Sequence, residues 1–350
     1  MIERIKAGIE GKYEGLKNGL ERINDYIFGV QKASYMLIGG LSGSAKTTLL
    51  DFMLLNAIED ARAKNISINI TYYSWEVDEQ SKRCNWLSVL VYKNYGIVIA
   101  PEKIKGLGKN RLTSEELQII ESTLPELESI FSKINWVWDS QHPTKMYNDW
   151  WNFMITRGKL VKELYKDENN VQKERIISFE ANDPEEYNIV AGDHLALAKL
   201  QQGFNLKQNI DKLSEYMILC RNLFKMTFIW LQQFNQGLSS VERMKFKGAD
   251  ISPQQSDFRD TTNPYIDADV VMGLMNAHKM DMDRCLGYDI NVPGSPVNLK
   301  DSFRMLKIVK NRLSRDNVAI GLLFTPKNGG FKELPLPTDL TKDWLDKNLN

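Results

Sequence analysis

The amino-acid sequence predicts an α/β fold with a twisted, largely parallel central sheet flanked by helices. Apolar runs alternate with helical patterns along most of the 350 residues, an order typical of parallel strands joined by helical crossovers. A glycine-rich turn also separates the first apolar run from the first helical pattern. The chain is 43% hydrophobic and 26% charged, which fits a globular protein with a sizeable core.

The pattern of apolar, turn-forming and capping residues predicts each element in order. The expected strands cover residues 35–38, 66–73, 134–138, 188–192, 226–231, 270–274, 305–309 and 318–324. The expected helices cover residues 46–63, 79–95, 113–131, 145–165 and 209–223. The polar stretch 166–187 is expected to be a solvated loop or a hairpin. Because no linker divides the series, we expect one domain over 26–331, preceded by an N-terminal segment or linker helix (1–25) and followed by a C-terminal tail (332–350).

Charge and cysteine content limit the classes of function. Lys plus Arg and Asp plus Glu both number 45, so the formal net charge is zero, and any nucleic-acid binding must come from a local basic patch. The three cysteines are too few and too far apart for a disulfide framework, which favours a reducing cytoplasm. No stretch approaches the roughly 18 apolar residues that a membrane helix needs, so we expect no membrane partner.

The turn after the first strand carries a phosphate-binding motif. It reads Gly-Leu-Ser-Gly-Ser-Ala-Lys-Thr-Thr from residue 40 and lies between a strand and a helix, the context that a P-loop requires. Its backbone N–H groups and the helix N-terminus would face phosphate oxygens. The expected ATP-binding residues are Gly40, Ser42, Gly43, Ser44, Ala45, Lys46, Thr47 and Thr48. Among these, Lys46 would reach the β- and γ-phosphates and Thr47 would hold Mg²⁺.

Ala45 departs from the P-loop pattern, which usually has glycine directly before the lysine. If the backbone there has a positive φ, alanine is strained by roughly 1–2 kcal/mol. An ATP-binding but catalytically weak loop is therefore one alternative that the sequence leaves open.

Three further polar residues end expected strands at the edge where α/β proteins bind ligands. Asp193 ends the strand 188–192 and would hold Mg²⁺ through water. Glu76 follows the strand 66–73 and is the candidate general base for the attacking water, with Asp78 and Glu79 as nearby competitors. One of the amides in Gln-Gln-Phe-Asn at 232–235, which follows the strand 226–231, could sense the γ-phosphate.

In this order, the motifs make residues 15–331 resemble the RecA-like motor domain of the DnaB/Twinkle group of replicative hexameric helicases. Ser-Trp-Glu at 74–76 is similar to that family's Ser-Leu-Glu, and Asp-His-Leu-Ala-Leu at 193–197 to its Asp-Tyr-Leu-Gln-Leu. Gln-Gln-Phe-Asn at 232–235 is similar to Ser-Gln-Leu-Asn, and Ser-Asp-Phe-Arg at 256–259 to Ser-Asp-Leu-Arg. Asp-Ala-Asp at 267–269 and Lys-Asn-Arg at 310–312 match the blocks Asp-Ala-Asp and Lys-Gln-Arg.

The resemblance implies roles for these residues. Glu76 would be the catalytic base and Gln233 the sensor, and Lys310 and Arg312 would reach a neighbouring subunit's γ-phosphate, where added positive charge stabilises the transition state. The expected DNA-binding residues are Arg243, Lys245, Lys247, Arg259 and Asp260. Four basic and three acidic residues over 239–259 leave a net charge of +1, which repetition around a ring would multiply.

The chain also departs from the family. Thr261 to Pro264 replace a glycine-containing loop, and residues 276–302 are longer than expected. The family's N-terminal domain is expected to be absent here, so its role would fall to a separate primase or loader.

The expectation is an ATP- and Mg²⁺-dependent single-stranded DNA translocase, a replicative helicase motor acting as a homo-oligomeric, hexameric ring. A RecA-type or clock-type ATPase that assembles on DNA or protein without unwinding is the second hypothesis. A nucleotide-binding scaffold silenced at Ala45 is the third.

Overall fold

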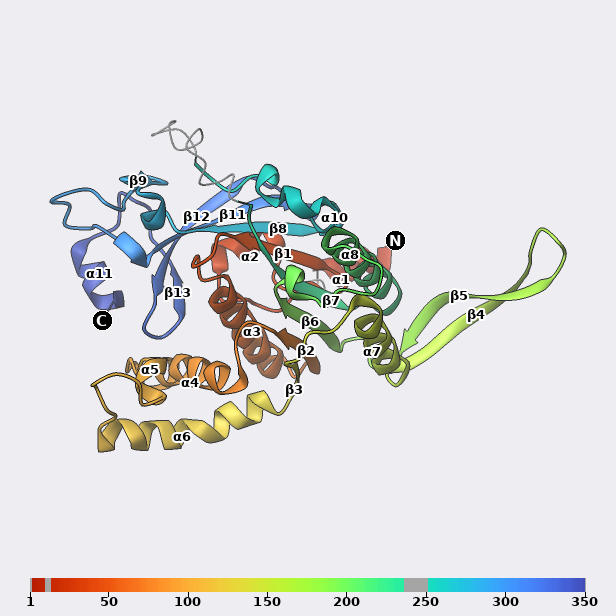
Figure 1. Cartoon of the computed structure of the whole chain (residues 1–350), viewed down its shortest axis with the longest axis horizontal. Helices are drawn as coiled ribbons and strands as arrows, with labels where there is room; N and C mark the ends of the chain where they lie inside the picture. The colour runs from red at the N-terminus through yellow and green to blue at the C-terminus, as the bar shows by residue number, and fades with distance from the viewer. Residues whose placement is uncertain (1, 10–13, 236–250, 350) are drawn as a thin grey trace.

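A computed structural model of the chain describes residues 2–9, 14–235 and 251–349 (Figure 1). Its main feature is a nine-stranded sheet in the order β13-β12-β11-β8-β1-β7-β6-β2-β3. The strands are β1 (Tyr35–Gly40), β2 (Ile68–Ser74), β3 (Ile134–Val137), β6 (Tyr187–Asp193), β7 (Thr227–Gln233), β8 (Val270–Met275), β11 (Phe303–Asn311), β12 (Val318–Thr325) and β13 (Gly330–Glu333). The six strands from β8 to β3 run parallel, whereas β11, β12 and β13 each pair antiparallel with the strand before them in this order, counted from β8. The predicted α/β fold with a largely parallel sheet is confirmed.

Helices connect the parallel strands, precede the first strand and follow the last one. They are α1 (Ile2–Ile9), α2 (Glu21–Ile27), α3 (Lys46–Ala63), α4 (Glu79–Tyr95), α5 (Pro101–Ile104), α6 (Ser114–Phe131), α7 (Pro143–Ile155), α8 (Leu206–Phe224), α10 (Thr262–Asp267) and α11 (Lys342–Leu349). The N-terminus of α6 shows how local sequence sets a boundary. The Thr113 side chain accepts a hydrogen bond from the Glu116 backbone, and the Glu116 side chain accepts one from the Thr113 backbone, which forms the capping box that the sequence predicts.

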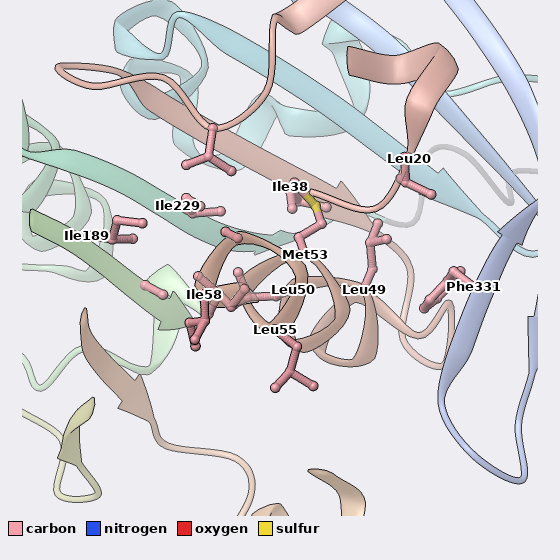
Figure 2. Packing of buried hydrophobic residues seen from close by; sticks show 14 of the residues in the cluster. Leu20, Ile38, Leu49, Leu50, Met53, Leu55, Ile58, Ile189, Ile229 and Phe331 are labelled. Atoms are coloured by element: carbon pink, nitrogen blue, oxygen red, sulfur yellow. The ribbon is translucent and has the colours of Figure 1, made fainter. Parts of the chain in front are cut away.

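The sheet is covered on both faces because its central strands are apolar on both sides. One cluster of buried residues joins α2, α3, α4 and α6 to side chains such as Ile38, Ile189 and Ile229 (Figure 2). A second cluster joins α7, α8 and the C-terminal residues to the alternate side chains, such as Leu37 and Phe228. Burial on both faces is what parallel strands in an α/β fold require.

One predicted helix is wrong in its second half. The helix expected over 145–165 ends at Ile155, and residues 158–166 instead form strand β4 (Gly158–Lys166). This strand pairs antiparallel with β5 (Gln172–Ala181) to make a separate two-stranded sheet. The ladder between the two strands outweighs the weak helical periodicity of residues 158–165. The hairpin expected within 166–187 is present, but it begins earlier.

The predicted segment boundaries fall inside secondary structure. Helix α2 spans the 25/26 boundary, and Leu20 and Ile23 on its N-terminal side are buried in the cluster around α3. Strand β13 spans the 331/332 boundary, and beyond it Leu340 and Leu345 are buried in the second cluster. The division of the chain into three segments stays a prediction. Within the described ranges, no helix is both long and apolar enough to cross a membrane.

Candidate functional site

The loop between β1 and α3 is shaped by close packing around its glycines. A Cβ at Gly40 would lie 2.6 Å from both the Leu274 carbonyl oxygen and Ser44 Oγ. Gly43 has a φ of +71° and so adopts the left-handed conformation that glycine tolerates best. The loop therefore ends β1, turns tightly and starts α3 at Lys46, as the sequence predicts.

Ala45 also lies in the left-handed region, with φ 75° and ψ 33°. Alanine pays roughly 1–2 kcal/mol there, because its Cβ approaches the following carbonyl. Ala45 immediately precedes the first residue of α3 and has no side-chain oxygen that could cap that helix. The surrounding structure therefore holds a strained residue directly beside Lys46.

Lys46 folds back over the loop that precedes it. Its Nζ donates hydrogen bonds to the carbonyl oxygens of Gly40 and Leu41, at 3.0 and 3.1 Å. Burial lowers the pKa of Lys46, while the charges of Asp193 and Glu76 raise it. The charges of these two carboxylates therefore influence the pKa of Lys46. Three separate sequence motifs thus contribute to one site.

Thr47 and Asp193 meet directly. Thr47 Oγ1 donates to Asp193 Oδ2 at 2.7 Å, because the end of β6 lies at the same sheet edge as the start of α3. Asp193 is 1% exposed, and its Oδ1 has no hydrogen-bond partner within the described residues. Burial raises the pKa of Asp193 to about 6, although the Thr47 hydrogen bond and the charge of Lys82 lower it.

This oxygen pair fits a hard divalent cation. A buried carboxylate oxygen without a partner, next to a threonine hydroxyl, is the donor chemistry that Mg²⁺ binds, with water completing its octahedron. Ser44 Oγ in the same loop is also buried and without a hydrogen-bond partner in the described part of the chain. Thr47 and Asp193 are therefore the residues that would hold Mg²⁺ beside the P-loop.

Glu76 lies at the mouth of this site, just after β2. Ser74 of β2 pairs in register with Asp193 of β6, so the residues that follow both strands are neighbours. Glu76 Oε1 lies 3.8 Å from His194 Nε2, and the Glu76 side chain is 51% exposed. Burial lowers the pKa of His194, whereas Glu76 raises it.

The two competing carboxylates are engaged elsewhere. Asp78 caps α4 by accepting a hydrogen bond from the Ser81 backbone at 2.9 Å, and Glu79 accepts one from Arg83 at 2.9 Å. Of the three acidic residues considered after β2, Glu76 is the one whose charge raises the pKa values of both Lys46 and Asp193.

Gln233 ends β7 next to the phosphate loop. It pairs in register with Gly40, and its side chain is exposed. Two residues later, the Asn235 N–H donates to the Asp257 carbonyl at 3.0 Å. This contact links the end of β7 to η3 (Gln255–Thr261), which contains the block at 256–260.

The predicted DNA-binding residues are only partly within the described structure. Arg243, Lys245 and Lys247 lie outside the described residues. Arg259 and Asp260 lie in η3, but their side chains also fall outside the description. The DNA-binding role of this set stays a prediction.

Lys310 and Arg312 lie at the opposite edge of the sheet. Strand β11 is antiparallel to β8, so its end lies beside the start of β1, one strand length or about 20 Å from the phosphate loop. Arg312 Nη2 donates to the Ile266 carbonyl at 2.7 Å, and Lys310 Nζ donates to the Tyr265 carbonyl at 2.8 Å. Burial, followed by the charge of Arg312, lowers the pKa of Lys310 to about 8. The structure therefore does not bring these two residues to the chain's own P-loop.

Two basic residues that the sequence motifs did not single out lie against the phosphate loop. Lys279, in η4 (His278–Met280), places its Nζ where a Cβ at Gly43 would collide with it. Arg304 in β11 is buried, and its Nε donates to the Ser44 carbonyl at 3.0 Å. Burial lowers the pKa of Arg304 to about 10. The unexpected length of residues 276–302 was the only sequence signal near these residues.

A buried ion pair behind Asp193 was also missed. Lys82 in α4 is fully buried, and its Nζ lies 3.0 Å from Asp51 Oδ2 and 3.1 Å from the Tyr72 hydroxyl. Tyr72 in turn donates to Asp51 at 2.8 Å. The network ties α3, α4 and β2 together on the inner side of the site.

No family model matches the chain, and no curated protein matches it. Solved structures do match. The ATPase domain of G40P aligns with a TM-score of 0.67 at 15% sequence identity, over 95% of this chain and 97% of its own length. A DnaB-like replicative helicase, described together with its interactions with primase, aligns with a TM-score of 0.65 at 16% identity over 92% of this chain. This chain spans 64% of that helicase's length. At such low identity the likeness establishes the fold: the chain has the RecA-like fold that these two solved structures share.

Proposed function

We propose that this chain is an ATP-hydrolysing motor that moves along single-stranded DNA as a ring of identical copies, with nucleotide bound between neighbours. The observation that carries the proposal is the separation of charged groups between two edges of one sheet. Lys46, Thr47, Asp193 and Glu76 gather at the P-loop edge. Lys310 and Arg312 lie at the other edge, where we propose that they act on the nucleotide of another copy.

Each residue at the P-loop edge would have its own role in ATP hydrolysis. Lys46 would leave its two loop carbonyls to neutralise the β- and γ-phosphates, and Thr47 and Asp193 would hold Mg²⁺. When bound, Mg²⁺ neutralises phosphate charge. Glu76, half exposed at the mouth, would accept a proton from the attacking water. Arg312 and Lys310 of the adjacent copy would stabilise the charge that develops on the γ-phosphate.

The coupling of hydrolysis to movement would start at the end of β7. Gln233 lies in register with Gly40, and Asn235 holds the block that starts at Ser256 through its Nδ2 at 3.0 Å from the Ser256 carbonyl. A change at the γ-phosphate would thereby be passed to the segment 236–260, which carries the expected DNA-binding residues. A separate primase or loader is the partner that the family resemblance adds.

Hydrolysis and unwinding are tested together on the full chain. ATP turnover is measured with and without oligo-dT, and strand separation is measured on a forked duplex. The expected result is turnover that rises with oligo-dT and unwinding that requires ATP. Glu76→Gln should retain nucleotide binding but lose turnover by roughly 10²–10⁴-fold, the usual contribution of a general base.

Two outcomes would contradict the proposal. Turnover without any unwinding, accompanied by filaments on DNA, would replace the helicase with an assembly ATPase. Tight ATP binding with no phosphate release, even with oligo-dT present, would identify a nucleotide-binding scaffold instead.

A further inference from the structure

The hairpin of β4 and β5, called the arm below, extends away from the body of the molecule (Figure 1). Its ladder runs from the pair Gly158 and Ala181 to the pair Lys166 and Gln172. Nine residues of strand span about 30 Å. Residues 162–166 and 171–178 are all exposed, so most of the arm is not covered by the body.

Among the described residues, the arm packs on the body at its base. The Phe179 ring packs edge-on against Phe224 of α8, with 5.0 Å between ring centroids, and Leu160 packs against the same cluster of buried residues. An isolated two-stranded hairpin is at best marginally stable in water, and its unpaired edges invite association. The outer part of the arm therefore needs a surface to lie on.

One face of the arm continues the apolar core outward. At the base of the arm, Leu160 pairs with Phe179. Two residues further along β4, Lys162 pairs with Ile176, and Leu164 follows after two more residues. Side chains alternate along β4, and a register shift between Val161 and Lys162 keeps Ile176 opposite Lys162 on β5. These residues therefore share the face that packs on the body. Leu164 is 61% exposed and Ile176 is 40% exposed. These two side chains form a short apolar strip that shares its face with the Lys162–Glu174 ion pair.

The charges on the arm are balanced, and three ion pairs join six of them. Residues 158–181 hold five basic and five acidic side chains, which cancel. The ion pairs Lys162–Glu174, Arg175–Glu163 and Lys173–Asp167 have N–O distances of 3.0, 2.8 and 2.7 Å. A nucleic acid is held mainly by uncompensated positive charge, so this composition favours a protein surface of mixed polarity.

The position of the arm in the fold indicates which surface it can reach. Its return strand leads through Pro184, whose carbonyl accepts a hydrogen bond from Lys32 Nζ at 2.6 Å, into the start of β6. The arm therefore leaves the same sheet edge that carries Lys310 and Arg312. Four strand spacings, about 19 Å, separate β6 from β11.

We infer that the arm docks on the adjacent copy of this chain, the copy whose P-loop edge faces Arg312. This inference rests on the proposed function, because that function places a second copy against this edge. The arm then buries Leu164 and Ile176 against the neighbour and acts as a second point of attachment beside the nucleotide site.

The first test disrupts the apolar strip and compares it with the other face. Assembly is followed by sedimentation velocity over a range of protein concentrations, with Mg²⁺ and a non-hydrolysable ATP analogue. The double variant Leu164→Asp with Ile176→Asp should raise the concentration of half-assembly by roughly tenfold or more, as loss of a buried apolar anchor does. Tyr165→Asp with Ser178→Asp adds the same charge to the opposite face and should assemble like the wild type. Equal nucleotide affinity and thermal unfolding in both variants show that the body is intact.

The second test finds what the arm touches. The native cysteines Cys84, Cys220 and Cys285 are buried, so Val171→Cys at the tip can be labelled selectively with a photo-crosslinker. Illumination should join two copies, with the crosslinked peptide on the neighbour's P-loop side.

The experiments distinguish a failure of the proposed function from a failure of the inference about the arm. If the wild type does not assemble with the nucleotide analogue at any concentration, the proposed function fails and the inference falls with it. If the wild type assembles and the Leu164 and Ile176 variant assembles equally well, only the arm inference is overturned. Crosslinks from the arm to oligo-dT, rather than to protein, would likewise overturn it.

Discussion

At the scale of single residues, the chemistry of the site depends on strain and burial as much as on charge. Lys46, Thr47, Asp193 and Glu76 could be predicted because each follows a strand or opens a helix at one sheet edge, and such positions converge in a parallel α/β fold. Lys279 and Arg304 could not, because nothing in their neighbouring sequence shows that distant segments fold back onto Gly43 and Ser44.

The backbone at Ala45 leads to a prediction about both stability and rate. Ala45→Gly relieves a strain of roughly 1–2 kcal/mol, although the greater freedom of glycine in the unfolded chain offsets about 0.4–1 kcal/mol. We expect the free energy of unfolding to rise by about 0.5–1 kcal/mol and ATP turnover to increase. Urea denaturation and a phosphate-release assay measure the two effects. A less stable variant would show that Ala45 is not strained.

Asp193 leads to a prediction with a defined pH dependence. Its folded pKa of about 6 lies above the ordinary value of 3.8. Protonated Asp193 therefore contributes to the free energy of unfolding in full below pH 3.8, and this contribution is lost as pH rises through the folded pKa, where the buried group becomes a carboxylate. Asp193→Asn removes the buried carboxylate, and in the absence of Mg²⁺ and nucleotide it should stabilise the protein by roughly 1–3 kcal/mol at about pH 7.5. The gain should fall by roughly half at about pH 5, while hydrolysis is lost at both.

Denaturant titrations of wild type and variant at the two pH values measure this difference. A stabilisation that is independent of pH would mean that the ionisation of Asp193 is not its source. An unchanged hydrolysis rate would remove Asp193 from the Mg²⁺ site.

At the scale of elements, capping and packing explain which boundaries were predictable. The ranges of α3 and α4 agree with the sequence because Lys46 follows a glycine turn and Asp78 caps α4. The helix predicted over 145–165 failed after Ile155, because the pairing of β4 with β5 is a contact between segments that local periodicity cannot report. Strand β13 and helix α11 were missed for a similar reason, since short elements at the end of the chain depend on packing against the body.

The ion pair between α3 and α4 makes a prediction at this scale. Lys82→Met leaves Asp51 buried without its cation, and removing one partner of a buried pair costs about 3–5 kcal/mol. The free energy of unfolding should fall by that amount in a denaturant titration. The pKa of Asp193 should also rise further, because the Lys82 charge no longer lowers it.

The matched control replaces both partners. Lys82→Met combined with Asp51→Leu removes the charge and its counter-charge together, so much of the lost stability should return. A double variant as unstable as Lys82→Met alone would show that packing or the Tyr72 hydroxyl, rather than an unpaired carboxylate, accounts for the loss.

At the scale of the whole molecule, the direction of the strands separates two halves of one proposed active site. The parallel strands from β8 to β2 place Gly40, Asp193 and Gln233 at one edge, whereas antiparallel β11 carries Arg312 to the other. The sequence could indicate this arrangement only through its family resemblance, because the direction of β11 relative to β8 is a property of the folded sheet.

Mixing two inactive variants tests this arrangement most directly. Lys46→Ala removes the lysine of the P-loop and Arg312→Ala removes the residue proposed to act on a neighbour, so each protein alone should hydrolyse ATP at a negligible rate. In an equal mixture, about a quarter of the interfaces join an intact P-loop to an intact Arg312. A site shared between neighbours predicts that hydrolysis returns to a comparable fraction of the wild-type rate. A mixture that stays inactive, or an Arg312→Ala protein that is fully active alone, would contradict it.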